Sequence, residues 1–121
     1  MFKPPITSVS DHSDEHIVCE AVINDDYPNL NRQRIVPIWF GLEFITDSIA
    51  LHGELCSNDS GSFVGASKVD YMANSFSDGQ ELQIEIELRQ EKDGVRLYKG
   101  KVVDKMTEEP LVESLIKTYV G

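Results

Sequence analysis

Residues 35–55, IVPIWFGLEFITDSIALHGEL, decide the fold of this chain. Their composition predicts one helix that begins near Pro37 and ends between Gly53 and Leu55. A helix that is apolar nearly all round has to be enclosed by other parts of the protein, because that surface must leave water. At this length it is too short and too polar to span a membrane. The residues that cover most of its circumference are Ile38, Trp39, Leu42, Phe44, Ile45, Ile49 and Leu51.

The rest of the chain predicts β-strands. Residues 81–90, ELQIEIELRQ, alternate cleanly between apolar and polar side chains, which is the pattern of a half-buried strand. A hairpin turn at Lys92-Asp93-Gly94 joins this segment to its return strand. We expect an extended entry over residues 1–10 and turns at 11–15 and 73–80. The five predicted strands are residues 16–24, 63–72, 81–90, 95–104 and 111–120.

The order of these elements predicts an α+β fold. One strand precedes the long helix, and a run of antiparallel strands with short turns follows it. Because a single sheet must bury the helix, the sheet has to curl about it. A curved antiparallel sheet wrapped around one long central helix is the hotdog fold. We expect residues 1–121 to form a single hotdog domain.

Composition excludes several classes of partner. Eleven basic and 21 acidic residues give a formal net charge of −10, which repels phosphate backbones and anionic membranes. The first residues contain no apolar core of signal-peptide length, so we expect a cytoplasmic protein without nucleic-acid or membrane partners. Cys19 and Cys56 are isolated thiols without metal-ligand spacing, and we expect both to be reduced.

Two carboxylates interrupt the apolar helix. Glu43 and Asp47 are one turn apart and therefore share a face. Either acid alone is explained by a polar edge of the sheet, since the helix dipole stabilises acids in the first turns. As a pair on one face of an otherwise apolar helix, they favour a site that contains at least one of them.

Several segments together resemble a known family. They are Pro4-Pro5-Ile6, Arg34-Ile35-Val36-Pro37, Phe40-Gly41-Leu42-Glu43-Phe44, Ile49-Ala50-Leu51-His52-Gly53, Ser62-Phe63-Val64-Gly65-Ala66 and Asp78-Gly79-Gln80-Glu81-Leu82. Over nearly its full length the chain resembles the hotdog-fold 3-hydroxyacyl-(acyl-carrier-protein) dehydratases. The nearest branch is the small ApeP-like proteins of aryl-polyene and related fatty-acid-type gene clusters.

The resemblance implies removal of water from a 3-hydroxyacyl thioester of an acyl carrier protein or coenzyme A, with no metal and no cofactor. Glu43 matches the acidic position of the ApeP-like branch, and Asp47 matches the acid of other dehydratases if the alignment slips by one residue. Gly41 matches the glycine whose N–H polarises the thioester carbonyl, although it equally fits packing at the helix entry. Tyr27 and Gly65 are the further candidates for substrate binding.

The usual catalytic histidine is missing from both positions where the family carries it. The loop before the helix reads Tyr27-Pro28-Asn29-Leu30, and the position before the N-terminal prolines is Phe2. His52 lies about 140° around the helix from Asp47 and cannot share its face, so an ordinary helix-end histidine is expected. His12 and His16 flank the first strand, where solvated loop histidines are expected. Tyr27 is a poor base at neutral pH, because its unperturbed pKa is about 10.

Three functions stay open at this point. The first is a dehydratase that uses Glu43 or Asp47 with an unidentified base. The second is a hotdog acyl thioesterase, in which a carboxylate activates water. The third is a catalytically degenerate subunit that completes an active dehydratase. Sheet edges and one side of the helix need covering, so a homodimer is expected, with a heterodimer with another hotdog dehydratase as the alternative.

Overall fold

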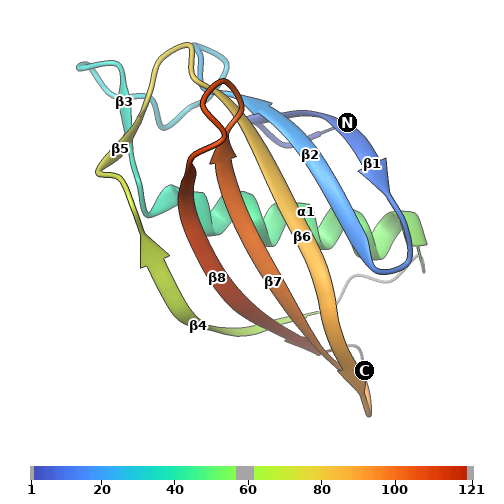
Figure 1. The fold of residues 1–121 in the computed structure, drawn as a ribbon. Coiled ribbons are helices and arrows are strands. Elements are labelled where there is room, and N and C mark those ends of the chain that lie inside the picture. The colour runs from blue at the N-terminus through green and yellow to red at the C-terminus, as the bar shows by residue number, and fades with distance from the viewer. Residues whose placement is uncertain (1, 57–61, 120–121) are drawn as a thin grey trace.

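The computed structural model describes residues 2–56 and 62–119 (Figure 1). The elements are β1 (Ile6–His12), β2 (His16–Val22), β3 (Ile35–Pro37), α1 (Phe40–Cys56), β4 (Ser62–Tyr71), β5 (Ser75–Ser77), β6 (Glu81–Lys92), β7 (Val95–Asp104) and β8 (Pro110–Tyr119). The five predicted strands are present, with ends shifted by no more than a few residues. The end of the last predicted strand, Val120, lies outside the described residues.

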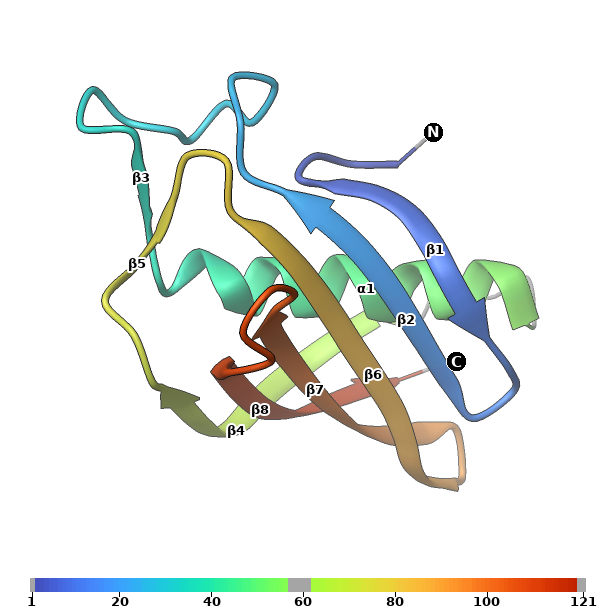
Figure 2. The ribbon, with the colours of Figure 1, turned by 45° about the horizontal axis from the view of Figure 1, so that its top comes forward.

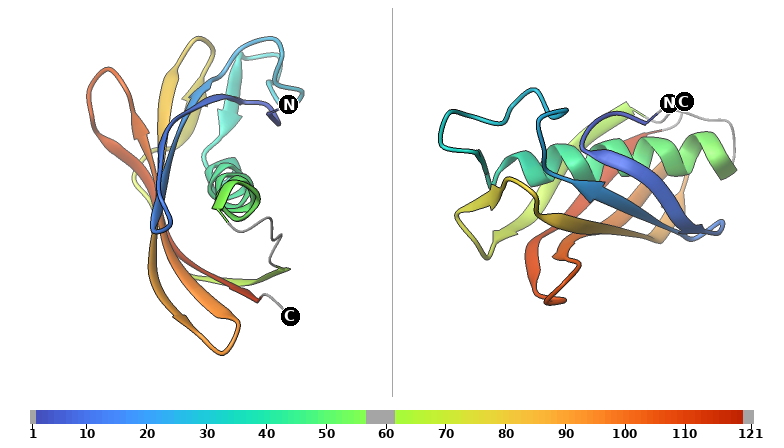
Figure 3. Two further views of the ribbon diagram at one scale, coloured as in Figure 1. Left: turned by 90° about the vertical axis from the view of Figure 1, so that its right-hand side faces the viewer. Right: turned by 90° about the horizontal axis from the view of Figure 1, so that it is seen from above.

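Six strands form one antiparallel sheet in the order β1-β2-β6-β7-β8-β4. The sheet curves around α1, and the end-on view of Figure 3 shows the helix in the hollow of the sheet with one side facing away from it. The predicted α+β hotdog fold is therefore confirmed. Within the described ranges, no helix combines the length and the hydropathy that crossing a membrane requires.

Alternation along β2 and β6 builds the centre of the core. The two strands pair residue for residue, with Cys19 opposite Ile84 and Ala21 opposite Leu82. These four inward side chains are at most 1% exposed. Each large aliphatic side chain buried in this way contributes roughly 1.5–3 kcal/mol relative to leaving it in water. The alternating pattern of residues 81–90 thus explains which face of the sheet meets the helix.

β1 is a strand that the sequence pattern does not reveal. Its residues were expected as an extended entry and a turn, yet they pair with β2 from Ile6 opposite Ala21 to His12 opposite Ile17. Two irregularities interrupt this register, and most of the strand is exposed. No strict alternation of apolar and polar side chains develops in such a strand. Pairing with the edge of β2 decides its structure instead.

A second, two-stranded sheet precedes the helix and was also not expected. β3 pairs with β5, with Val36 opposite Phe76 at its centre and both side chains fully buried. Figure 2 shows this ribbon at the N-terminal end of α1. The N–H of Ile38 donates to the carbonyl of Asn74, and this bond ties the chain to the segment before β5. The helix therefore begins at Phe40, three residues later than predicted.

The helix has one buried face and one open face, which agrees with the expectation that one of its sides needs covering. The buried residues recur at helical spacing: Gly41, Phe44, Ile45, Ser48, Ile49, His52 and Gly53. On the other side Trp39, just ahead of the first turn, is 61% exposed, and Leu55 is 50% exposed. The sheet curls far enough to cover only part of the circumference.

Two glycines allow the helix to approach the sheet closely. A Cβ built on Gly41 would lie 2.7 Å from Cγ2 of Val112 and 3.1 Å from Cζ of Phe76. A Cβ on Gly100 of β7 would collide with the side chain of Ile45. Since real Cβ atoms do not approach other atoms so closely, both positions fix the height of α1 above the sheet.

Candidate active site

The carboxylates of Glu43 and Asp47 lie together on the open face of α1, on the same side of the helix as predicted. The ammonium group of Lys3 joins them, with Nζ 3.7 Å from Oε1 of Glu43 and 3.7 Å from Oδ1 of Asp47. Within residues 2–56 and 62–119, no other basic side chain lies at ion-pair distance from either acid. Glu43 and Asp47 thus share one ammonium group, that of Lys3.

Asp47 is the more enclosed of the two acids. Its side chain is 20% exposed, against 40% for Glu43. Oδ2 of Asp47 is buried and has no hydrogen-bond partner among the described residues. Burial raises the pKa of Asp47; Lys3 opposes this effect, and the negative charge of Glu43 adds to it. A carboxyl group that holds its proton above the ordinary range is suited to general acid catalysis.

Two hollows flank the carboxylates. One, of about 410 Å³, is mainly apolar and is lined by Trp39, Phe40, Leu42, Glu43 and Thr46. The other, of about 180 Å³, lies further along the helix and is lined by Lys3, Ile6, Asp47, Ala50, Leu51 and Glu54. An apolar chain in the first hollow would place its polar end beside the acids.

Gly41 lies in the first turn of α1, where its N–H donates to the carbonyl of Ile38 at 2.9 Å. The next N–H, of Leu42, donates to the carbonyl of Trp39 at 3.2 Å. A thioester carbonyl at Gly41 would therefore have to share or replace an existing bond. The contacts of this glycine with Val112 and Phe76 show a packing role at the helix entry.

Tyr27 lies beneath the start of the helix and is 3% exposed. Its ring meets Phe40 and Phe44 edge to face, with centroids 6.5 and 5.6 Å apart. Its hydroxyl accepts a hydrogen bond from the amide of Asn29 at 3.2 Å. Burial raises the pKa of Tyr27, and the charges of Glu43 and Asp47 raise it slightly further. Tyr27 is therefore near the acids but is less suited to act as a base than a free tyrosine.

Gly65 occupies an irregularity in the pairing of edge strand β4 with β8. In the described part of the chain no atom lies within 4 Å of a Cβ built on it, so no neighbouring group packs closely against this glycine. Neither hollow beside the acids is lined by Gly65.

The three histidines, all within the described residues, have other partners or lie in solvent. His12 is exposed at the end of β1. His16 contacts Ser13 at 2.6 Å and Asp11 at 2.9 Å. His52 lies near the helix end, as expected, but it is 3% exposed and fixed between two elements. None of them shares the open face with the carboxylates.

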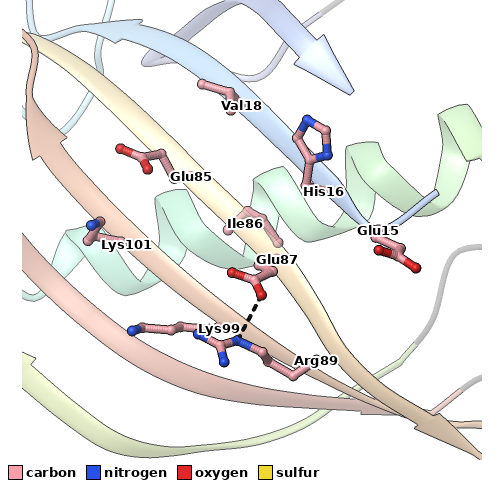
Figure 4. A pocket seen from close by; sticks show the side chains of 9 residues that line it. All are labelled: Glu15, His16, Val18, Glu85, Ile86, Glu87, Arg89, Lys99 and Lys101. Atoms are coloured by element: carbon pink, nitrogen blue, oxygen red, sulfur yellow. Dashed lines mark ion pairs between the residues drawn. The ribbon is translucent and has the colours of Figure 1, made fainter. Parts of the chain in front are cut away.

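A separate hollow of about 430 Å³ lies on the outer face of the sheet (Figure 4). Acids and bases alternate across its strands, with Glu85 opposite Lys101 and Glu87 opposite Lys99. Arg89 completes the row through an ion pair with Glu87 at 3.1 Å. The strands lie between these side chains and α1. Paired surface charges of this kind are ordinary for a solvated sheet face and offer no catalytic group to the helix.

Lys3 is the member of the site that sequence reasoning missed. It lies in the segment ahead of β1 and not in the helix motif. Its only signal in the sequence is a cation directly before Pro4-Pro5. Nothing in that position indicates that its side chain reaches the two acids of α1.

Comparison with known proteins agrees with the fold and the helix motif. A family model described as ApeP-like: ApeP dehydratase matches residues 6–121. No curated protein matches the chain in a sequence search. Among solved structures, the chain is similar to the dehydratase heterocomplex ApeI:P from Xenorhabdus doucetiae, with a TM-score of 0.81 and 22% identity over 97% of this chain and 82% of that one.

Two other similar structures bear different names. Thioesterase superfamily member 2 of zebra fish has a TM-score of 0.78 and 13% identity, covering 93% of this chain and 80% of its own. The protein smu.793 from Streptococcus mutans UA159, bound to acetyl CoA, has a TM-score of 0.77 and 12% identity, covering 94% and 87%. At such identities these similarities establish the shared fold alone.

Proposed function

Because the chain belongs to the ApeP-like dehydratase family, we propose that it is a subunit of a dehydratase acting on 3-hydroxyacyl thioesters of an acyl carrier protein or coenzyme A. One observation carries the proposal. Glu43 and Asp47 lie together on the open helix face, Glu43 in the lining of an apolar hollow and Asp47 in that of a smaller hollow of mixed character. An acyl chain bound in the apolar hollow would then end beside the two acids.

In the proposed reaction the substrate thioester lies at the N-terminus of α1. The positive end of the helix dipole stabilises the charge that develops on the carbonyl oxygen. The N–H of Gly41 donates to this oxygen in place of the carbonyl of Ile38. A base takes the proton from the carbon beside the thioester carbonyl. Asp47 or Glu43 gives a proton to the 3-hydroxyl group, which leaves as water, and a carbon–carbon double bond remains.

A second hotdog subunit supplies the base in this proposal. The described residues place no histidine beside Glu43 or Asp47, and they leave the open helix face largely uncovered. Strands β1 and β4 are the unpaired edges of the sheet, which is a further reason for association. The similar ApeI:P structure is a dehydratase heterocomplex, which favours a heterodimer over the homodimer expected first.

The test compares the chain alone with its complex with a co-purifying hotdog dehydratase, using 3-hydroxyacyl thioesters of both carriers. We expect slow turnover by the chain alone and rapid turnover by the complex. In the complex, Asp47→Asn or Glu43→Gln should lower kcat/KM by a factor of about 10²–10⁴, the usual contribution of a general acid. Glu85→Gln on the outer face is the matched control and should change kcat/KM less than twofold.

A catalytically inactive subunit is the second candidate. It is favoured because the N–H of Gly41 already donates to the carbonyl of Ile38, and because His16 and His52 already have hydrogen-bond partners away from the acids. In that case the complex would keep its turnover in the double variant Glu43→Gln, Asp47→Asn. The partner subunit would then contain the whole catalytic machinery. The same measurement therefore separates the two functions.

A thioesterase is the third candidate, supported by the fold shared with zebra fish thioesterase superfamily member 2. A carboxylate alone can activate water, so this activity does not require the missing histidine. It would release free thiol from a saturated acyl thioester that has no 3-hydroxyl group. Thiol release that exceeds dehydration, and that Asp47→Asn abolishes, would favour this function over the dehydratase.

A further inference from the structure

Lys3 is held over the carboxylate pair by the backbone of its own segment. The N–H of Ile6 donates to the carbonyl of Lys3 at 3.0 Å, and the N–H of Val22 donates to the carbonyl of Pro5 at 3.1 Å. These two bonds tie the segment to the start of β1 and to β2. The lysine side chain then reaches across to α1, where its ammonium group is equidistant from the two acids.

We propose that Lys3 is a positioning residue that bridges Glu43 and Asp47 on the open face and sets the pH at which Asp47 releases its proton. This inference rests on the proposed function for its catalytic meaning, but the effect on Asp47 is a property of this chain alone. The ammonium group faces Oδ1 of Asp47, whereas Oδ2 is buried without a partner. The favoured position of a proton on Asp47 is therefore Oδ2.

The groups around Asp47 act in opposite directions. Burial and the charge of Glu43 favour the protonated form, and Lys3 favours the ionised form. Glu54 lines the same hollow as Asp47 and adds a further negative charge. Tyr27, from the loop after β2, is near enough for burial and the charges of both acids to raise its pKa, so it adds no charge of its own. The positive charge of Lys3 thus opposes these effects and stabilises the carboxylate that forms once Asp47 has donated its proton.

The test is a carboxyl-carbon NMR titration of Asp47 in the full chain. Replacing the charge in Lys3→Met should raise the titration midpoint of Asp47 by about 0.5–1 pH unit, as expected for one charge at this distance near a surface. Lys3→Arg should keep the midpoint close to that of the wild type. Glu43→Gln should move it in the opposite direction, because a neighbouring negative charge is lost.

A matched control removes a lysine of similar exposure elsewhere. Lys105 pairs with Glu20 at 3.2 Å on another part of the sheet, so Lys105→Met changes the net charge equally and should leave the midpoint of Asp47 unchanged. The side chain of Lys3 is 65% exposed, so high salt should shift the wild-type midpoint toward that of Lys3→Met. An unchanged midpoint in Lys3→Met would overturn the proposal.

The titration also separates this inference from the proposed function. If the complex dehydrates its substrate, the limb of its pH–rate profile that follows the loss of the Asp47 proton should move with Lys3→Met by the same amount as the NMR midpoint, and Lys3→Arg should restore it. If no dehydratase activity exists, the NMR result still decides the role of Lys3. A shifted midpoint with an unshifted pH–rate profile would show that Asp47 is not the acid.

Discussion

The two ends of α1 hold their ionisable side chains in different ways. Toward the C-terminal end, His52 is buried and bonded at both ring nitrogens: Nε2 donates to the carbonyl of Ser13 at 2.8 Å, and Nδ1 accepts from the hydroxyl of Tyr98 at 3.4 Å. Toward the N-terminal end, Glu43 and Asp47 lie on the open face, and among the described residues their ion pairs are the long ones to Lys3.

This difference indicates which residues are available for chemistry. The bond to the Ser13 carbonyl requires that Nε2 carries the proton, so the ring of His52 has neither a free base nor a free donor to offer. Cys56 also donates to this carbonyl, at 3.1 Å, which anchors the helix end to the β1–β2 turn. Asp47, by contrast, has an oxygen without a hydrogen-bond partner in the described part of the chain. His52 therefore has a structural role, and the two acids are the groups that the proposed reaction would use.

Removing the hydrogen bonds of His52, near the C-terminal end of α1, should give the largest change in stability. His52→Leu keeps the approximate volume but leaves the Tyr98 hydroxyl without its histidine partner and weakens the anchor at Ser13. We expect the free energy of unfolding to fall by about 2–3 kcal/mol, the cost of disrupting buried hydrogen bonds. Denaturant titration followed by circular dichroism measures it.

His52→Gln is the matched control, because its amide nitrogen reaches roughly the position of Nε2. It should recover about half of the loss by restoring the donor to Ser13. In the assembled complex, both variants should retain turnover per folded molecule within a few fold. A hundredfold loss of turnover in His52→Gln with little loss of stability would contradict the structural assignment and return His52 to the catalytic site.

A side chain added at Gly41, in the first turn of α1, should have the next largest effect on the free energy of unfolding. The new methyl group in Gly41→Ala meets Val112 and Phe76, which costs more than the gain in helix propensity, so we expect a net loss of about 1–2 kcal/mol. Gly65→Ala, where the space is open, should stay within about 0.5 kcal/mol. Thermal unfolding of the two variants gives both values, and equal losses would refute the packing role of Gly41.

Sequence patterns predicted the elements whose side chains follow a regular pattern along the chain. The alternation of residues 81–90 and the density of apolar side chains in 35–55 identified the sheet and its central helix. The pattern predicted that one side of the helix needs covering but not which side, because an apolar residue looks the same in the sequence whether its own chain or a partner covers it. The pairing of Glu43 with Asp47 followed from helical spacing alone.

The contacts between distant segments were not predictable in this way. Lys3 approaches Asp47 because β1 pairs with β2, and β1 has no alternating pattern of its own. His52 is buried because Ser13 and Tyr98, from two other elements, meet at the same place. Single residues that join elements far apart in the chain carry no periodic signal, and tertiary structure alone determines their partners.

A substitution of Asp47 should have the smallest effect on the free energy of unfolding, and this effect changes with pH. The raised pKa of Asp47 means that the folded chain holds a proton more tightly than the unfolded chain does. In the window from the ordinary value of 3.8 up to that raised pKa, the free energy of unfolding therefore falls as pH rises. Asp47→Asn removes this titration, so the stability of the variant relative to wild type should improve between pH 3 and pH 7. We expect an improvement within about 1 kcal/mol, because partly exposed charges are screened.

Denaturant titrations at the two pH values measure the difference. If the variant instead loses stability relative to the wild type as pH rises, the charge of Lys3 outweighs the effect of burial on the pKa of Asp47.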